Sequence, residues 1–260
     1  MKKNPLLKIL KIPAFLVFLA GVGFMVYYGH SYRAQAECRQ IDIRYKALPQ
    51  LTSRAEIYNI IRKECDTLEG FLQINLAGLE ARLDSLPFIK KSEVYRTLNG
   101  TLIVNLEERT PVARVFTPSG ASYFVDEQLQ VIPVRAGHTP MTALVTGKVP
   151  ESEEDAKKTF HDPWLKNLSA LDDAVGMLYY IRQDTFWHAM IEQVHITEEN
   201  ELELVPRVGN HIVLLGDTVG LAGKLNKLHL FYTEALSRGG WKSFRYINLK
   251  FKNQIICKTT

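Results

Sequence analysis

An uncharged apolar segment near the N-terminus constrains this chain more than any other feature. Residues 12–32 contain no Asp, Glu, Lys or Arg, and four lysines precede them, at positions 2, 3, 8 and 11. About 20 helical residues cross about 30 Å of hydrocarbon, and a helix satisfies its own backbone there. The basic N-terminal flank follows the positive-inside rule. The sequence therefore predicts a basic cytoplasmic tail at 1–11, a transmembrane helix at 12–32 and export of the rest.

A cleaved signal peptide is the alternative interpretation of the same segment. Ala34-Gln35-Ala36 offers the small residues of a cleavage site after a basic and then an apolar stretch. The apolar stretch, however, exceeds the usual signal-peptide core of about 7 to 15 residues, and Arg33 stands where cleavage sites seldom carry charge. Glu37 before Cys38 excludes a lipid-anchor site. Both interpretations place most of the chain outside the cytoplasm.

The net charge of +4 belongs to the N-terminal tail and not to the exported part. Lys and Arg number 32 against 28 Asp and Glu, so the four tail lysines account for the whole excess. A nucleic-acid-binding domain concentrates basic residues on the surface that meets phosphate. The even balance therefore excludes nucleic acid as a partner, and a hydrophobic content of 46% excludes a disordered chain.

Three cysteines are expected in an oxidising compartment. Cys38 and Cys65 could pair and leave Cys257 alone, but an odd number is equally consistent with three thiols. The sequence contains no CxxC motif, so redox catalysis and structural zinc have no support. We expect neither a metal nor a cofactor.

The first exported segment begins with the pattern of a strand and two helices. Alternate residues from Ile41 to Tyr45 are apolar, as in a strand with one buried face. A capping box of Ser53 and Glu56 predicts the start of one helix. Asn75 is a candidate cap for a second helix, which carries leucines at helical spacing and ends near Pro87.

Asn99-Gly100 is the strongest turn signal in the chain. Asn-Gly can supply the two positive φ angles of a type I′ turn, here between strands at 94–98 and 102–106. The resulting order is β-α-α-β-β, and we expect both helices on one face of the sheet.

This segment resembles a POTRA domain over Ile41 to Val115, and the stretches 86–96 and 102–113 resemble the FtsQ/DivIB family of cell-division proteins. The most specific piece is Glu108-Arg109-Thr110-Pro111-Val112-Ala113. The resemblance implies a POTRA domain at 37–110, a domain hinge at Glu108, Arg109 and Pro111, and a C-terminal β domain at 111–260. The chain departs from the family with Leu98-Asn99 in place of Trp-Pro, and with Leu129 in place of a turn glycine.

After Pro111 the pattern changes to short strands, which we expect at 112–116, 122–125, 130–134 and 141–145. The charged segment 151–161 lacks an apolar period and is typical of an exposed loop. A helix is expected from Pro163 to Tyr179, strands at 191–196, 201–205 and 211–215, and a helix at 219–236. Strands at 244–251 and 254–257 close the chain. The fold class is α+β, a mixed β domain with flanking helices following the POTRA domain.

The sequence offers no catalytic signature. GxSxG, HExxH, P-loop and GxGxxG motifs are all missing, and the seven histidines are scattered. The adjacent carboxylates Asp172-Asp173 and Glu198-Glu199 point away from each other in regular structure, which suits solvent better than paired acid–base work. We therefore expect a binding protein and not an enzyme.

The family resemblance implies a bitopic divisome scaffold of the cell inner membrane, with its N-terminus in the cytoplasm and its C-terminus in the periplasm. Such a scaffold links early division components to FtsB/FtsL-type coiled-coil partners and to septal peptidoglycan synthesis, and it contacts the lipid bilayer through residues 12–32. The alternative is a signal-anchored envelope hydrolase with no recognised motif.

The resemblance also implies a partner site in the C-terminal strands, where residues 246–251 stand at the position of an aromatic-x-Asp-Leu-Arg-aromatic strand. An extended segment can bind such a strand by pairing with its backbone, while alternate side chains give specificity. Ile247 and Leu249 are expected to pack inward. The predicted partner-binding residues are Tyr246, Asn248, Lys250, Phe251 and Asn253, and the principal side-chain contacts are assigned to Lys250 and Phe251.

Overall fold

The structure is a computed structural model, and it describes residues 15, 17–25, 27, 40–48, 51–66, 74–97, 99–162, 169–236, 244–252 and 254–259. The chain divides into two compact units, with the boundary between Glu108 and Arg109. The predicted cytoplasmic tail lies outside the described residues. Over the parts of the chain just given, no helix combines the length and the apolar character needed to cross a membrane.

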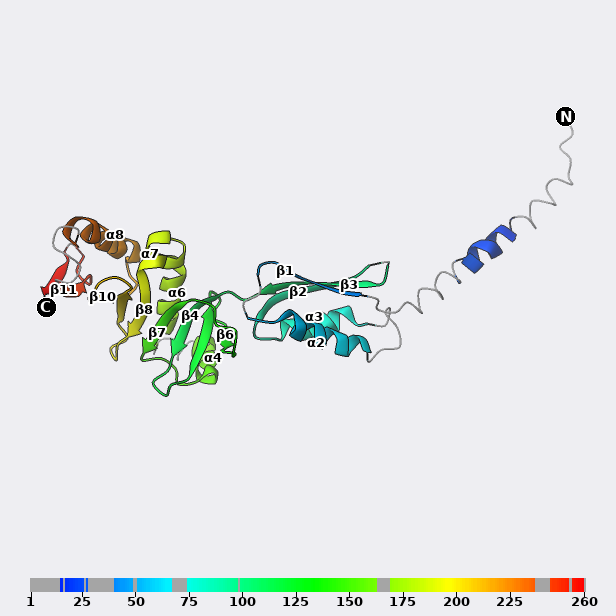
Figure 1. Ribbon diagram of the computed structural model, residues 1–260, viewed down its shortest axis with the longest axis horizontal. Helices are drawn as coiled ribbons and strands as arrows, with labels where there is room; N and C mark the ends of the chain where they lie inside the picture. The colour runs from blue at the N-terminus through cyan, green and yellow to red at the C-terminus, as the bar shows by residue number, and fades with distance from the viewer. Residues whose placement is uncertain are drawn as a thin grey trace, which may run out of the picture. The chain divides into compact units, whose positions relative to one another are not determined.

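The first unit is a three-stranded sheet with both helices on one face (Figure 1). Its central strand, β3, is parallel to β1 and antiparallel to β2. The β-α-α-β-β order is the one expected from the sequence. From residue 40 onward its elements are β1 (Gln40–Tyr45), α2 (Arg54–Asp66), α3 (Leu76–Asp84), β2 (Ile89–Arg96) and β3 (Thr101–Glu108).

Local caps and apolar stripes account for the two helices. The Ser53 hydroxyl accepts the Glu56 N–H at 3.2 Å, and the Asn75 side chain accepts the Gly78 N–H at 3.0 Å. These bonds satisfy amides that the first turn of a helix leaves without a partner. The buried stripe of the helices packs on the inner face of the sheet in a core that includes Ile43, Ile57, Ile61, Leu79, Leu83, Val94, Val104 and Leu106.

The hairpin between β2 and β3 corrects the predicted turn type. Gly100 has a φ of 84°. The Gly100 N–H donates to the Thr97 carbonyl at 3.3 Å, and the Thr97 N–H donates to the Thr101 carbonyl at 2.9 Å. A three-residue hairpin loop typically consists of a type I turn followed by a residue, often glycine, in the left-handed conformation. The type I′ prediction was therefore wrong, because the loop is one residue longer than the two-residue turn it assumed.

The outer edge of β2 is closed by carboxylates from α3. The Val94 N–H donates to Glu80 Oε1 at 2.6 Å, and the Ser92 N–H donates to Asp84 Oδ1 at 2.6 Å. Glu80 and Asp84 are four residues apart on a helix, so their side chains share a face and reach alternate amides of the strand. An edge strand whose amides are already bonded is protected against pairing with another chain.

The second unit is built on a sheet of nine strands within the described residues, in the order β12-β11-β10-β9-β8-β7-β4-β5-β6. Its strands are β4 (Pro111–Phe116), β5 (Ser122–Asp126), β6 (Val131–Pro133), β7 (Ala143–Gly147), β8 (Ile191–Ile196), β9 (Leu202–Pro206), β10 (Ile212–Gly216), β11 (Phe244–Asn248) and β12 (Ile256–Thr259). Its helices are α4 (Glu153–His161), α6 (Leu171–Arg182), α7 (Thr185–Met190), α8 (Leu221–Phe231) and the π-helix η2 (Tyr232–Leu236).

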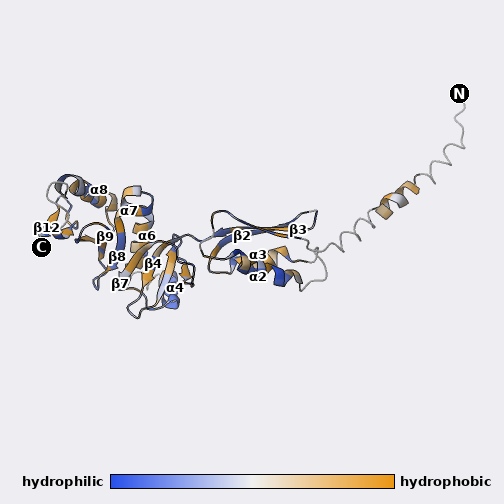
Figure 2. Cartoon of the chain, viewed as in Figure 1, coloured by the Kyte–Doolittle hydropathy of each residue, from blue (hydrophilic) through white to orange (hydrophobic). Residues whose placement is uncertain are grey.

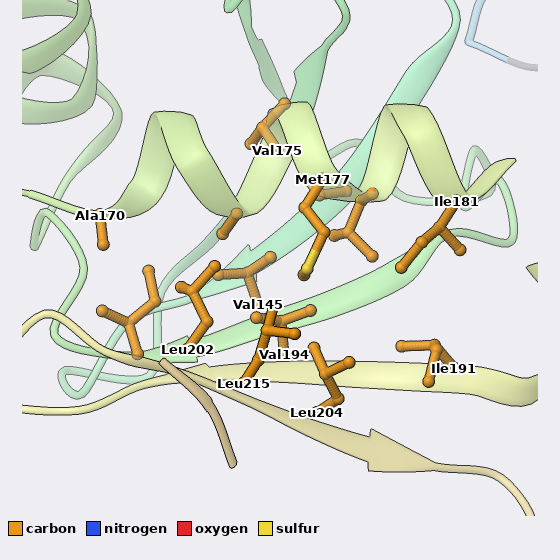
Figure 3. Packing of buried hydrophobic residues seen from close by; sticks show 14 of the residues in the cluster. Val145, Ala170, Val175, Met177, Ile181, Ile191, Val194, Leu202, Leu204 and Leu215 are labelled. Carbon is orange, nitrogen blue, oxygen red and sulfur yellow. The ribbon is translucent and has the colours of Figure 1, made fainter. Parts of the chain in front are cut away.

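Helix α6 supplies the apolar layer over the centre of this sheet (Figure 3). Met177 and Ile181 point from the helix toward strand residues that include Val194 and Leu204, and Val175 is buried in the same core. Hydrophobic residues concentrate along β4 and α6, whereas α4 is largely hydrophilic (Figure 2). Each Å² of apolar area buried contributes about 25 cal/mol, so this layer stabilises the unit.

Helix α4 replaces the exposed loop predicted at 151–161. The Ser152 hydroxyl caps it by accepting the Asp155 N–H at 3.1 Å, and Glu154 pairs with Lys158 one turn later at 3.0 Å. Acidic residues in the first turn also complement the helix dipole. The prediction was wrong because only Ala156 is buried, so the helix has almost no apolar stripe. Residues 163–168, where the next helix was expected to begin, lie outside the described residues.

Leu129 occupies a backbone position that favours glycine. Its φ is 60°, and its N–H donates to the Asp126 carbonyl at 3.1 Å in the turn between β5 and β6. A left-handed conformation costs about 1–2 kcal/mol for a residue with a Cβ atom. The Leu129 side chain is partly buried against the core of the second unit, which offsets part of this cost. The departure from a turn glycine noted in the sequence therefore falls at a real left-handed position.

Candidate partner-binding site

The C-terminal end of the large sheet is formed by β12 and not by β11. Strand β11 pairs with β10 in parallel on one side and with β12 antiparallel on the other. Asn248 lies opposite Ile256, and Ile247 lies opposite Cys257. The two edges of β11 are thus occupied. Among the described residues the outermost strand at this end is β12, so backbone groups available to an incoming strand belong to Ile256–Thr259.

The predicted binding strand 246–251 ends earlier than expected. Strand β11 stops at Asn248, whose side-chain oxygen accepts the Lys250 N–H at 2.9 Å. An Asn side chain that bonds the backbone two residues on favours a turn. Lys250 and Phe251 therefore lie in the connection to β12. Ile247 and Leu249 are fully buried, as expected, but Phe251 is 44% exposed and does not share their face.

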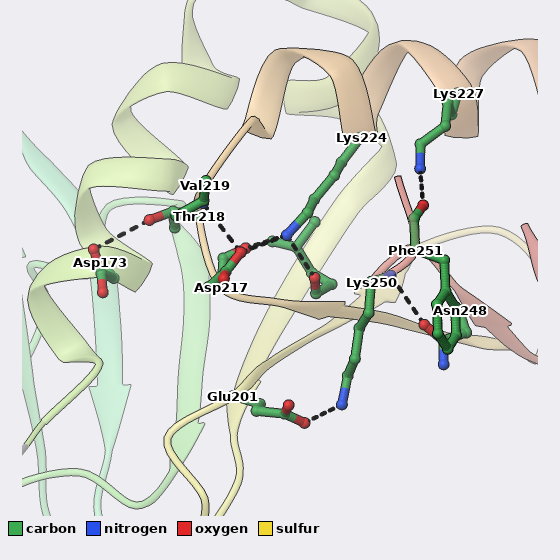
Figure 4. Close-up of polar contacts among 11 residues, drawn as sticks. Asp173, Glu201, Asp217, Thr218, Val219, Lys224, Lys227, Asn248, Lys250 and Phe251 are labelled. Carbon is green, nitrogen blue, oxygen red and sulfur yellow. Dashed lines mark hydrogen bonds and ion pairs between the residues drawn. The ribbon is translucent and has the colours of Figure 1, made fainter. Parts of the chain in front are cut away.

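The five predicted partner-binding residues are brought together only in part. Tyr246 and Asn248 are half-buried in β11, and Lys250 and Phe251 follow in the turn. Lys250 forms an ion pair with Glu201, and the Phe251 carbonyl accepts a hydrogen bond from the Lys227 ammonium at 2.6 Å (Figure 4). Asn253 lies outside the described residues.

The exposed side chains of β12 were not singled out from the sequence. Ile256 is 46% exposed, and Lys258 and Thr259 are also exposed. Lys258 lies opposite Tyr246 on the neighbouring strand. Strand β12 has only four residues, which is too short for an alternation of apolar and polar residues to be recognised. The available signal for an exposed edge was therefore its position after the strand at 244–248.

The first hinge residue, Glu108, is anchored in the first unit. Its carboxylate accepts the Leu51 N–H at 3.2 Å, the Thr52 N–H at 2.9 Å and the Thr52 hydroxyl. Leu51 and Thr52 are both 2% exposed. The carboxylate thus satisfies amides that would otherwise be buried without an acceptor at the start of α2.

The next hinge residues, Arg109 and Pro111, are anchored in the second unit. The Arg109 guanidinium donates to the Asp126 carboxylate at 2.9 Å, with side chains 17% and 3% exposed. Pro111 starts β4, and its carbonyl accepts the Arg182 guanidinium at 3.3 Å. The chain therefore passes from one set of contacts to the other between Glu108 and Arg109.

A polar cavity of about 410 Å³ lies on the first unit, lined by Arg44, Tyr45, Lys46, Lys91, Glu93, Asn105, Leu106 and Glu107. Two of its three cations pair with carboxylates of the lining, and the third, Arg44, pairs with Asp42. Lys46 lies 2.9 Å from Glu107, and Lys91 lies 2.7 Å from Glu93. The hydrogen bond from Lys46 lowers the pKa of Glu107, which favours the charged form in this pair.

The titratable side chain of His211, in the second unit, is buried and hydrogen-bonded within the fold. His211 is 2% exposed, and its Nε2 lies 2.8 Å from the Tyr232 hydroxyl. Burial lowers the pKa of His211, so the ring is neutral at neutral pH. Within the described ranges no group of three or more His, Cys, Asp or Glu is arranged to hold a metal ion. Cys38 lies outside those ranges, so the disulfide and the free thiols both stay open as alternatives for Cys38 and Cys65.

Comparison with protein families identifies both units. The POTRA domain of the FtsQ type matches residues 42–109, and the FtsQ/DivIB C-terminal related domain matches residues 110–258. A comparison with curated proteins gives no match. Because the second match alone covers more than half of the chain, the protein belongs to the FtsQ/DivIB family, whose role in cell division is non-catalytic.

Proposed function

We propose that this protein is a bitopic scaffold of the divisome, which binds other division proteins through the β12 edge of its second unit. Family membership supports the cell-division role. The coiled-coil partners of the FtsB/FtsL type and the septal peptidoglycan synthesis proteins are the partners proposed. Residues 12–32 are proposed as a single membrane span of the cell inner membrane, with the basic tail in the cytoplasm and residue 260 in the periplasm.

The observation that carries the binding mode is the difference between the β12 edge and the edges at β2 and β6. The β2 edge has its Ser92 and Val94 amides bonded to carboxylates of α3. At the far end of the large sheet, β6 has three residues and finishes at Pro133, which has no N–H to offer. Strand β12 has exposed residues at Ile256, Lys258 and Thr259 and lies at the opposite end.

Strand addition explains why a scaffold can bind without a deep cavity. Main-chain hydrogen bonds to β12 supply affinity, and alternate side chains supply specificity. Phe251 is well placed for such specificity, because it is 44% exposed and lies in the turn that leads to β12. A buried aromatic anchor can contribute about 2 kcal/mol or more to binding.

Localisation in dividing cells tests the proposed function. A fluorescent fusion of the full chain should form a band at midcell, because a scaffold of the divisome follows the division site. A matched fusion of residues 1–39 alone should spread over the envelope, since it lacks both folded units. An even distribution of the full-length fusion would contradict the proposal.

A further inference from the structure

The turn between β11 and β12 is tied to the rest of the second unit by side chains from distant parts of the chain (Figure 4). Lys250 pairs with Glu201, which directly precedes β9. Lys227 of α8 donates to the Phe251 carbonyl at 2.6 Å. Glu201 and Lys227 both lie outside the C-terminal hairpin of β11 and β12. Their contacts therefore hold the turn of this hairpin against the rest of the second unit.

Lys250 reaches Glu201 by crossing the end of β10 at Gly216. Gly216 pairs with Leu202 of β9 and has a φ of 75°. A Cβ atom at Gly216 would lie 3.1 Å from Lys250 Cγ, closer than most side-chain contacts. The missing side chain therefore provides the space through which the Lys250 stem passes to Glu201.

The end of β10, past which the Lys250 side chain runs, is held by hydrogen bonds from Lys224. Lys224, whose side chain is 12% exposed, donates to the Leu215 carbonyl at 3.1 Å and to the Asp217 carbonyl at 2.9 Å. Its ammonium also lies 2.6 Å from the Asp217 carboxylate, and this hydrogen bond lowers the pKa of Asp217. Lys224 thus links α8 to the end of β10, near the place where the Lys250 side chain passes.

We propose that Glu201, Lys227 and Lys250 are positioning residues that hold β12 on the sheet, and that Lys250 acts through Glu201. The inference rests on the proposed function only in taking β12 as the edge that partners bind. A four-residue strand at the end of a sheet opens easily by local unfolding. A partner binds only those molecules in which β12 is paired with β11, so its apparent affinity falls when that fraction of molecules falls. Residues that fix the turn therefore affect the affinity without touching the partner.

A charge-swap cycle in the full chain tests this inference by hydrogen exchange at Ile256–Thr259, with no partner present. Glu201→Lys and Lys250→Glu each place like charges together and should speed exchange by about threefold, the range expected for exposed pairs. The double variant restores the pair with its charges reversed and should return exchange to near the wild-type rate. Lys227→Met removes the other tie and should also accelerate exchange by about threefold.

Lys252→Glu is the matched control, because Lys252 lies in the same turn and pairs with no described residue. It should leave exchange unchanged. The inference is overturned if Glu201→Lys has no effect on β12, if the double variant is no closer to wild type than the single variants, or if Lys252→Glu accelerates exchange as much as Lys250→Glu. Because no partner enters this experiment, its failure is distinct from failure of the proposed function, which midcell localisation decides.

Discussion

Asp126→Ala in the full chain should destabilise the second unit by about 3–5 kcal/mol, the range seen when one partner of a buried ion pair is removed. Asp126 is 2% exposed and accepts the Gln128 and Gln130 amides at 2.9 Å and 2.8 Å, besides the Arg109 guanidinium. Its removal leaves a mostly buried cation unpaired and two turn amides without their acceptor. Calorimetric or chemical unfolding of the full chain measures the loss.

Two variants separate this effect from a general loss of charge. Asp126→Asn keeps an oxygen acceptor for the turn amides and should cost less than Asp126→Ala. Asp42→Ala removes an exposed carboxylate paired with Arg44 and should cost less than about 1 kcal/mol, as exposed ion pairs do. Equal destabilisation by Asp126→Ala and Asp42→Ala would show that the buried contacts at the domain boundary carry no special weight.

Ending the chain at Gln254 should reduce recovery of FtsB/FtsL-type partners by more than tenfold. The truncation removes β12, and with it the backbone groups proposed to pair with an incoming strand. The core should persist, because the fully buried Ile247 and Leu249 remain. Quantitative co-purification from dividing cells measures binding, and thermal melting of the same preparations checks folding.

Side-chain variants of β12 give the control for this truncation. Lys258→Ala keeps the backbone of the strand and removes only an exposed side chain, so recovery of partners should stay within about twofold of wild type. A folded truncated chain that still recovers its partners fully would place the binding surface elsewhere. A large loss on Lys258→Ala would indicate recognition through that side chain instead of through the backbone.

Features that depend on neighbouring residues could be predicted from the sequence. The Asn75 cap, the Ser53 cap and the alternation in β1 each arise from a few consecutive positions, and the structure contains all three. The β-α-α-β-β order followed from them together with the Asn99-Gly100 turn. Helix α4 escaped prediction because its stability comes from a cap and an ion pair, not from an apolar period.

Features that depend on distant residues could not be predicted in the same way. The strand at 244–251 was expected to continue through Lys250 and Phe251, but the Asn248 side chain accepts the Lys250 N–H and turns the chain. The place of β12 at the end of the sheet depends on β11 pairing in parallel with β10 after α8. The partner of Lys250, Glu201, lies 49 positions away in the sequence, and no local pattern joins them.

Site-specific photo-crosslinking in dividing cells tests the central claim most directly. A crosslinker placed in turn at Ile256, Lys258 and Thr259 should capture a bitopic division protein, because these residues lie on the strand proposed as the partner edge. The same crosslinker at Lys91 or Glu93 of β2 should not capture it, since that edge is closed by Glu80 and Asp84. Capture of the division protein from β2, with none from β12, would contradict the account.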